Sequence, residues 1–124
     1  MRILHVCTGV MLMATSGLAL QSPYHLKVLS WSCQLSPRDA WVRGTVRNIG
    51  DRPLQDVRAS ARVLGRGLRV ATNSAPIRAR ILRPGETASF SVRVPTYFDS
   101  KRRCELGFRN PALIQIASLI PDPR

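Results

Sequence analysis

The sequence contains few of the side chains that catalysis needs. It has two histidines, three cysteines and seven acidic residues in a chain of 124. No serine lies in a Gly-x-Ser-x-Gly motif, and Gly65-Arg66-Gly67 lacks the spacing of a phosphate-binding loop. A nucleophile needs a neighbouring base, and a metal ion needs clustered histidine, cysteine or carboxylate ligands. The sequence therefore predicts a protein that is not an enzyme, with no catalytic residue, metal, cofactor or small-molecule substrate.

Lysine and acidic residues are also scarce. The chain has 19 basic and 7 acidic residues and a formal charge of +12, and Lys27 and Lys101 are its only lysines. Arginine therefore supplies nearly all of the positive charge. Its planar guanidinium group forms paired hydrogen bonds with phosphates and carboxylates, so an acidic partner is one interpretation of this charge. The alternative is a solvated, arginine-rich surface, because net charge alone supports solubility and non-specific attraction.

A long, mainly apolar segment, Ile3–Leu20, follows the positively charged start of the chain. Gly17 and Ala19 place small residues at the positions that signal peptidases recognise before a cut after Ala19. An uncleaved membrane anchor is the alternative, since the segment is just long enough to span a bilayer. We expect a cleaved signal peptide at residues 1–19 and a single domain at residues 20–124, exported to the periplasm or secreted.

Two cysteines, Cys33 and Cys104, remain after this cleavage. An even number of cysteines in an exported chain favours a disulfide. Each cysteine alternates in step with apolar neighbours, so both thiols are expected to face the interior. A bridge between them would close a loop of about 70 residues and stabilise the fold by about 4 kcal/mol on the chain-entropy model. Two buried free thiols are the alternative.

The segment Trp41–Leu64 shows strict alternation on both sides of a turn. One face carries valine, alanine and glycine, and the other carries arginine, threonine and serine. Side chains alternate across a strand, so one face is suited to a core and the other to water or an anion. The intervening residues, Asn48–Pro53, are typical of a turn. We expect this segment to form a two-stranded hairpin.

Similar alternation and turn signals predict further strands. They lie at His25–Cys33, Leu68–Ala71, Ile77–Ile81, Phe90–Val94 and Cys104–Phe108. Thr72–Pro76 is expected to be a loop, and the tail segment Ala112–Leu119 is either a last strand or a loose cover. About seven short strands without a convincing helix predict an all-β, antiparallel β-sandwich, with a small barrel as the alternative.

The segment WVRGTVRNIGDRPLQDVRASARVL, followed by LRPGETASFSVRVP, resembles the FxLYD type of domain found in exported bacterial proteins. The shared pattern is Val-x-Gly-x-Val-x-Asn, a Gly-Asp-x-Pro-Leu turn, a valine-rich strand, and Leu-x-Pro-Gly-Glu before Phe-x-Val-x-Val-Pro. It covers Trp41–Pro95 and departs at Val63-Leu64-Gly65, where the family often has Leu-Tyr-Asp. The resemblance implies an immunoglobulin-like sandwich that acts as an adaptor or interaction module.

Ten basic residues are candidates for binding an anion. If the alternation holds, four of them share the outer face of the expected hairpin, three lie on outer faces of other strands, and three form a basic loop. They are Arg43, Arg47, Arg58 and Arg62, then Arg78, Arg80 and Arg93, then Lys101, Arg102 and Arg103. Only Trp41 shares the hairpin face as an aromatic platform, which disfavours nucleic acid.

The sequence supports three hypotheses for function. The first is a non-catalytic interaction module of the bacterial envelope or extracellular space, with an unidentified protein partner. The second is binding of an anion or polyanion, such as a phosphorylated lipid at a membrane surface or an acidic protein, by the arginine-rich face. The third is a subunit of an assembly that pairs through an exposed edge strand or through Ala112–Leu119.

Overall fold

The computed structural model describes residues 23–98 and 100–124, with only the backbone described for Lys101 and Arg102. The predicted signal peptide, residues 1–19, lies outside the described residues. No helix long and apolar enough to cross a membrane occurs in the described part. Its regular elements are all strands: β1 Leu26–Leu35, β2 Asp39–Asn48, β3 Leu54–Gln55, β4 Arg58–Gly65, β5 Val70–Pro76, β6 Ile81–Leu82, β7 Thr87–Pro95, β8 Lys101–Arg109 and β9 Ser118–Leu119.

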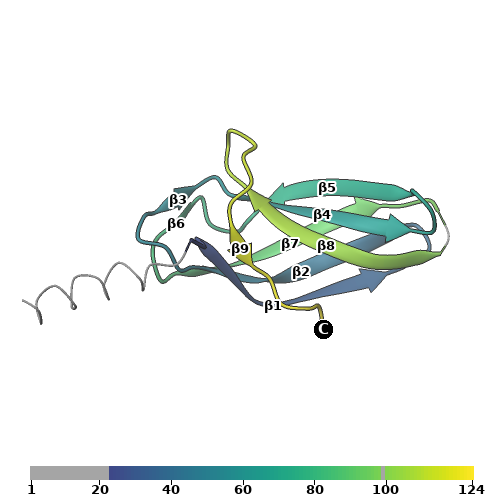
Figure 1. Cartoon of the computed structure of the whole chain (residues 1–124), viewed down its shortest axis with the longest axis horizontal. Helices are drawn as coiled ribbons and strands as arrows, with labels where there is room; N and C mark the ends of the chain where they lie inside the picture. The colour runs from purple at the N-terminus through teal and green to yellow at the C-terminus, as the bar shows by residue number, and fades with distance from the viewer. Residues whose placement is uncertain (1–22, 99) are drawn as a thin grey trace, which may run out of the picture.

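Two sheets face each other and form a sandwich (Figure 1). One has the strand order β7-β2-β1-β9 and the other has the order β5-β4-β8, while β3 and β6 form a small two-stranded sheet at one end. All pairings are antiparallel except β1 with β9. This arrangement confirms the predicted all-β, immunoglobulin-like antiparallel sandwich.

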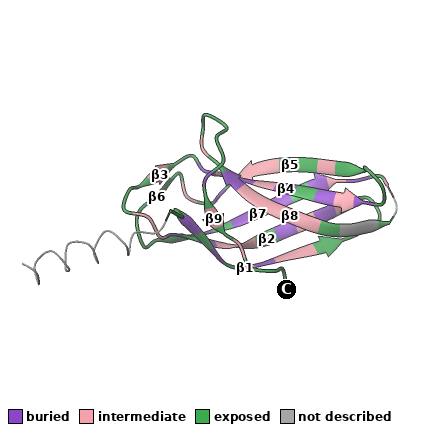
Figure 2. Cartoon of the chain, viewed as in Figure 1, coloured by how far each residue is buried: buried purple, intermediate pink, exposed green. Residues whose placement is uncertain are grey.

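The core lies between the sheets, where the apolar side of each alternating strand is buried (Figure 2). Val42 and Val46 of β2 and Ala59 and Val63 of β4 are fully buried, and these four come from the segment whose alternation predicted an apolar face. Phe90 and Phe108 meet across the core at a ring-centroid distance of 5.4 Å and an interplanar angle of 86°. Edge-to-face pairs of this kind add stability beyond the burial of their area.

The expected hairpin between the two halves of Trp41–Leu64 is wrong. β2 pairs with β1 and β7, whereas β4 pairs with β5 and β8 in the opposite sheet. The chain between them does not turn back, because it crosses from one sheet to the other and adds β3 on the way. Alternation is the same for a strand in either sheet, so it predicted the buried faces correctly and the partner strands incorrectly.

Asn48, the last residue of β2, holds this crossing in place. Its side chain is fully buried, and its amide nitrogen donates to the carbonyl oxygens of Arg52 and Leu82, both at 2.8 Å. Its side-chain oxygen accepts from the backbone N–H of Gly50 at 2.9 Å. Because Arg52 lies in the crossing and Leu82 lies in β6, one amide joins two segments that are far apart in the sequence.

Two further segments differ from the prediction. Ile77–Ile81 is not a strand: only Ile81 and Leu82 pair with β3, although Ile77 is buried and donates its N–H to the carbonyl of Val57 at 3.1 Å. Thr72–Pro76, expected as a loop, belongs to β5 and pairs with β4. Its polar side chains are compatible with a strand because backbone pairing with β4, and not burial, holds it there.

The tail forms a short strand and also covers a sheet edge. β9 pairs in parallel with the start of β1, and further along the N–H of Arg124 donates to the carbonyl of Trp31 at 2.9 Å. The indole N–H of Trp31 donates to the carbonyl of Pro121 at 2.6 Å. The tail therefore follows β1 over most of its length.

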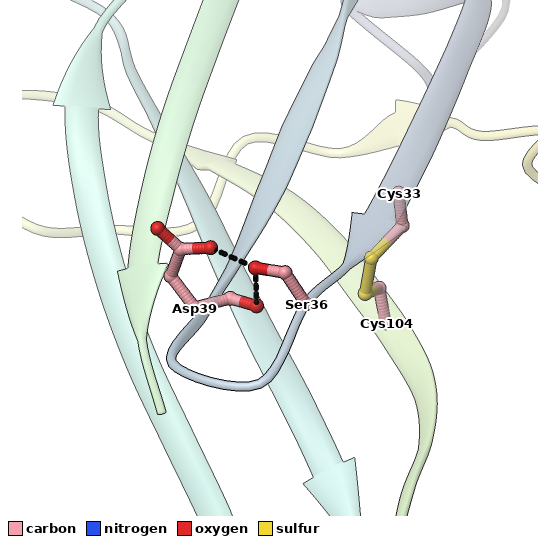
Figure 3. The surroundings of a disulfide bond; sticks show 4 residues. All are labelled: Cys33, Ser36, Asp39 and Cys104. Atoms are coloured by element: carbon pink, nitrogen blue, oxygen red, sulfur yellow. Dashed lines mark hydrogen bonds between the residues drawn. A yellow bond between two sulfur atoms is a disulfide. The ribbon is translucent and has the colours of Figure 1, made fainter. Parts of the chain in front are cut away.

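The predicted disulfide between Cys33 and Cys104 is confirmed in the structure (Figure 3). It joins β1 to β8 and hence one sheet to the other, with a Cα–Cα distance of 6.4 Å. Beside it, the hydroxyl of Ser36 contacts a carboxylate oxygen of Asp39 and donates to its backbone carbonyl in the turn between β1 and β2.

Replacing the buried amide of Asn48 is expected to destabilise the fold more than replacing an exposed one. Asn48→Ala removes the three hydrogen bonds of a buried side chain and is expected to lower the free energy of unfolding by about 3 kcal/mol. Asn73→Ala, which removes exposed side-chain hydrogen bonds, is the matched control and should cost about 1 kcal/mol or less. Urea unfolding at constant m-value measures both, and equal losses would contradict the role given to Asn48.

The disulfide is expected to form when the protein is produced in an oxidising compartment, and to stabilise it. Reduction should add the mass of two hydrogen atoms to the intact chain. The double variant Cys33→Ser and Cys104→Ser should unfold more easily, by up to about 4 kcal/mol, because the bridge closes a loop with a sequence separation of 71. An unchanged mass on reduction of the purified exported protein would show that the bridge does not form.

Candidate functional site

The outer surface of the sheet formed by β7, β2 and β1 carries a group of basic side chains, here called the basic face. The alternation that buries Val42 and Val46 directs Arg43 and Arg47 outward from β2. Neighbouring strands add one residue each, Arg93 from β7 and Lys27 from β1. All four side chains are exposed. Two of the four, Arg43 and Arg47, lie about 13 Å apart along one strand, at 3.3 Å per residue.

Arg43 is held flat against the sheet. Its guanidinium carbon lies 4.5 Å from the ring centroid of Trp41, which is the predicted aromatic neighbour on this face. A terminal nitrogen of Arg43 also donates to the side-chain oxygen of Gln34 at 3.4 Å. A cation stacked on an indole keeps its charge and its outward N–H groups. Arg43 is therefore oriented before any ligand arrives.

Arg47 lies directly opposite Lys27 in the register of β1 and β2. Like charges at directly opposed positions destabilise a sheet. In the described part of the chain neither residue has an ion pair with an acidic side chain. Lys27 was not among the residues singled out from the sequence. Its place between apolar Leu26 and Val28 indicates an outward side chain, but the alternation does not reveal which strand lies beside it.

Arg93 is the neutralised member of the basic face. Its Nε donates to a carboxylate oxygen of Asp39 at 2.8 Å, and the Arg93 side chain is 48% exposed. Its position is diagonal to that of Arg43 on the neighbouring strand, which places the two Cα atoms about 7–8 Å apart. The basic face therefore combines one paired arginine with three cations that no carboxylate neutralises among the described residues.

Small hydroxyl side chains separate the cations of the basic face. Register places Ser91 of β7 and Ser32 of β1 on either side of Arg43, and Ser89 and Ser30 on either side of Thr45. None of these side chains is bulky enough to shield the arginines. Hydroxyl groups both donate and accept hydrogen bonds, so they can bind the oxygens of an anion that lies flat on the sheet.

Arg58 and Arg62 do not belong to the basic face, which corrects the expectation that four arginines share one surface. Both point outward from β4 in the opposite sheet. Arg58 donates from Nε to the hydroxyl of Ser74 at 3.2 Å and from a terminal nitrogen to the carbonyl of Ser74 at 3.2 Å. Arg62 lies 3.7 Å from a carboxylate oxygen of Glu105. Because β2 and β4 lie in different sheets, the two pairs of arginines face in opposite directions.

The other candidate cations are more scattered. Arg103 shares Glu105 with Arg62, at 3.6 Å, on the outer side of the second sheet. Arg78 and Arg80 lie in the irregular segment between β5 and β6, and Arg80 is 3.9 Å from Asp56. The side chains of the remaining two candidates, Lys101 and Arg102, lie outside the described residues. The ten candidates therefore form several separate groups.

Several carboxylates have structural contacts. Glu86 accepts the backbone N–H of Arg83 at 2.7 Å in the turn before β7. Asp39 and Glu105 are engaged with arginines. Among the described residues no three histidine, cysteine or carboxylate side chains cluster in a way that could hold a metal ion.

Comparison with known proteins does not identify a family for this chain. No protein-family model matches the chain, and no curated protein matches it. The resemblance of Trp41–Pro95 to the FxLYD type of domain therefore stays a prediction from the sequence.

Proposed function

We propose that this protein is a non-catalytic, exported interaction module that binds an anionic partner through its basic face. One observation supports this most strongly: Arg47 and Lys27 are held side by side without a neutralising carboxylate among the described residues. A sheet that keeps two like charges opposed gives up stability, and an anionic ligand between them recovers it.

The geometry favours an extended polyanion over a small ion. The four cations are spread along and across three strands, and none of them lines the pocket beside Trp31 and Leu106 or the one beside His25 and Leu54. A polymer or surface that repeats phosphate, sulfate or carboxylate groups can contact several of them at once. Arginine can bind each such group with two N–H donors, and the guanidinium group of Arg43 is already positioned by Trp41 and Gln34.

The second sheet is a weaker candidate for the same role. Three of its arginines, Arg58, Arg62 and Arg103, already contact Ser74 or Glu105, so an incoming anion would have to displace those contacts. Exposed ion pairs contribute little stability, but each lowers the local positive potential that attracts a ligand. The two faces of the sandwich therefore differ in how far their cations are already engaged by neighbouring side chains.

The basic face is expected to govern retention on a sulfated polymer. The double variant Arg43→Gln and Arg47→Gln should elute from immobilised heparin at lower salt, and the slope of log affinity against log salt should fall by about 2. The wild-type protein should stay bound at about 0.3 M salt, where weak long-range attraction is largely screened.

Two exposed arginines in the β4–β5 connection provide the matched control. Arg66→Gln with Arg69→Gln removes the same charge outside both sheet faces, so its retention should stay close to that of the wild-type protein. Equal losses for the two double variants, or loss of wild-type retention at about physiological salt, would show that bulk charge alone binds heparin.

Export is expected to accompany removal of the N-terminal segment. The protein purified from the producing cell's envelope or medium should have the intact mass of a chain beginning at Leu20, because Gly17 and Ala19 form the predicted cleavage site. Fractionation and mass spectrometry measure this together. A cytosolic protein that keeps residues 1–19 would contradict the proposal of an exported module.

A further inference from the structure

The outer edge of β8 is open. β8 pairs with β4 on one side and forms the edge of its sheet on the other. In immunoglobulin-like sandwiches the last strand of the chain lies at this edge. In this protein the segment after β8 begins to lie along that edge, because the N–H of Ile116 donates to the carbonyl of Phe108 at 2.8 Å. It then leaves β8, and β9 joins β1 instead. Figure 1 shows this crossing, where the last strand passes from β8 towards β1.

The alternation of backbone groups identifies which atoms the open edge presents. The carbonyl of Phe108 points away from β4, since it accepts from Ile116. Residues two and four positions earlier, Leu106 and Cys104, have the same orientation, so their N–H and C=O groups also point outward. In the described part of the chain no other backbone group pairs with them. The open edge from Arg103 to Gly107 is about 14 Å long at 3.4 Å per residue.

The chain's own tail is not able to pair along this edge. It runs beside the open edge with the sequence Ile120-Pro121-Asp122-Pro123, and proline has no N–H to donate to a ladder. The tail is also committed to β1, through the contacts of Pro121 and Arg124 with Trp31. The edge of β8 is thus left to a strand from elsewhere.

A groove follows the open edge. It has a volume of about 760 Å³ and is lined by β8, by Trp31 and Cys33 of β1, and by the tail. Its lining is mixed, and Leu106 and the Cys33–Cys104 disulfide form an apolar part of its floor. A strand placed there would direct every second side chain onto this floor and the others outward.

The charges at the groove select the partner. Arg62, Arg103 and Arg109 line it, against the carboxylates Glu105 and Asp122, and Glu105 is already shared by two of the arginines. Arg109 also lies opposite Arg58 in the register of β4 and β8, a second pair of opposed like charges. A second copy of this chain, with its formal charge of +12, would be repelled.

We propose that the open edge of β8 binds an extended, acidic segment of another protein as an added strand, with apolar side chains on the groove floor and carboxylates beside the arginines. Backbone hydrogen bonds to Leu106 and Cys104 supply the affinity, and the alternating side chains supply the selectivity. This site is separate from the basic face, so its test is independent of the test of the polyanion proposal.

A synthetic peptide of alternating valine and glutamate, about eight residues long, tests the proposal on the full, disulfide-bonded protein. Binding should shift the indole N–H resonance of Trp31, which lines the groove, and leave that of Trp41 unchanged. At a peptide concentration about ten times the Kd, hydrogen exchange of the Leu106 and Cys104 amides should slow about tenfold. Unchanged exchange at these two amides would overturn the proposal.

Two controls separate strand addition from other binding. A peptide with lysine in place of glutamate should not bind, and equal binding by it would overturn the acidic partner. Leu106→Pro removes an outward N–H without removing a hydrogen bond to β4, so it should abolish peptide binding, whereas Leu106→Ala should keep it. Binding retained by the proline variant would contradict strand addition. If that variant does not fold, amide exchange in the wild-type protein still decides the question.

Discussion

The buried side-chain amide of Asn48 fixes the path by which the chain crosses from the first sheet to the second. It joins the end of β2 to the crossing at Arg52 and to Leu82 of β6, and all three contacts of its side chain are with backbone groups. Burying a polar group costs free energy unless its hydrogen bonds are satisfied. The hydrogen bonds of Asn48 therefore fix the path of the chain at the point where it leaves the first sheet. A tight return of β4 onto β2 would leave these groups without partners.

This crossing decides how the charge is distributed. Because β2 and β4 enter opposite sheets, arginines that alternate along one continuous stretch of sequence are divided between two surfaces. On one surface Arg43 and Arg47 keep their charge available beside Lys27. On the other, Glu105 and Ser74 satisfy Arg58 and Arg62. The crossing thus produces one face on which Arg47 and Lys27 have no acidic partner among the described residues, and one on which Arg62 and Arg103 share Glu105. The edge of β8 provides a third surface, with backbone groups that can pair with a strand.

The alternation of side chains in the sequence predicted part of the fold and of the candidate site. Alternation identified the buried faces of β2, β4, β7 and β8, and parity with apolar neighbours turned Cys33 and Cys104 towards the core, where they are partly buried and form the disulfide. The partner strands, the position of Lys27 opposite Arg47, and the departure of the tail from β8 depend on contacts between distant segments. The alternation of side chains along a strand does not reveal these contacts, since a strand has the same pattern in either sheet. The prolines at positions 121 and 123 were visible, but their effect on β8 appears only when the neighbouring edge is known.

The central claim is that the basic face, and not the opposite sheet or the charge as a whole, binds the anionic partner. Two tryptophans make this testable in one measurement, because Trp41 lies on the basic face and Trp31 lies in the groove beside the tail. The measurement is a two-dimensional NMR titration with a short heparin oligosaccharide. We expect the Trp41 indole resonance and the Arg43 and Arg47 amide resonances to shift. The Trp31 indole resonance and the Arg58 and Arg62 amide resonances should stay unchanged. Shifts confined to Arg58 and Arg62, or spread evenly over both sheets, would contradict it.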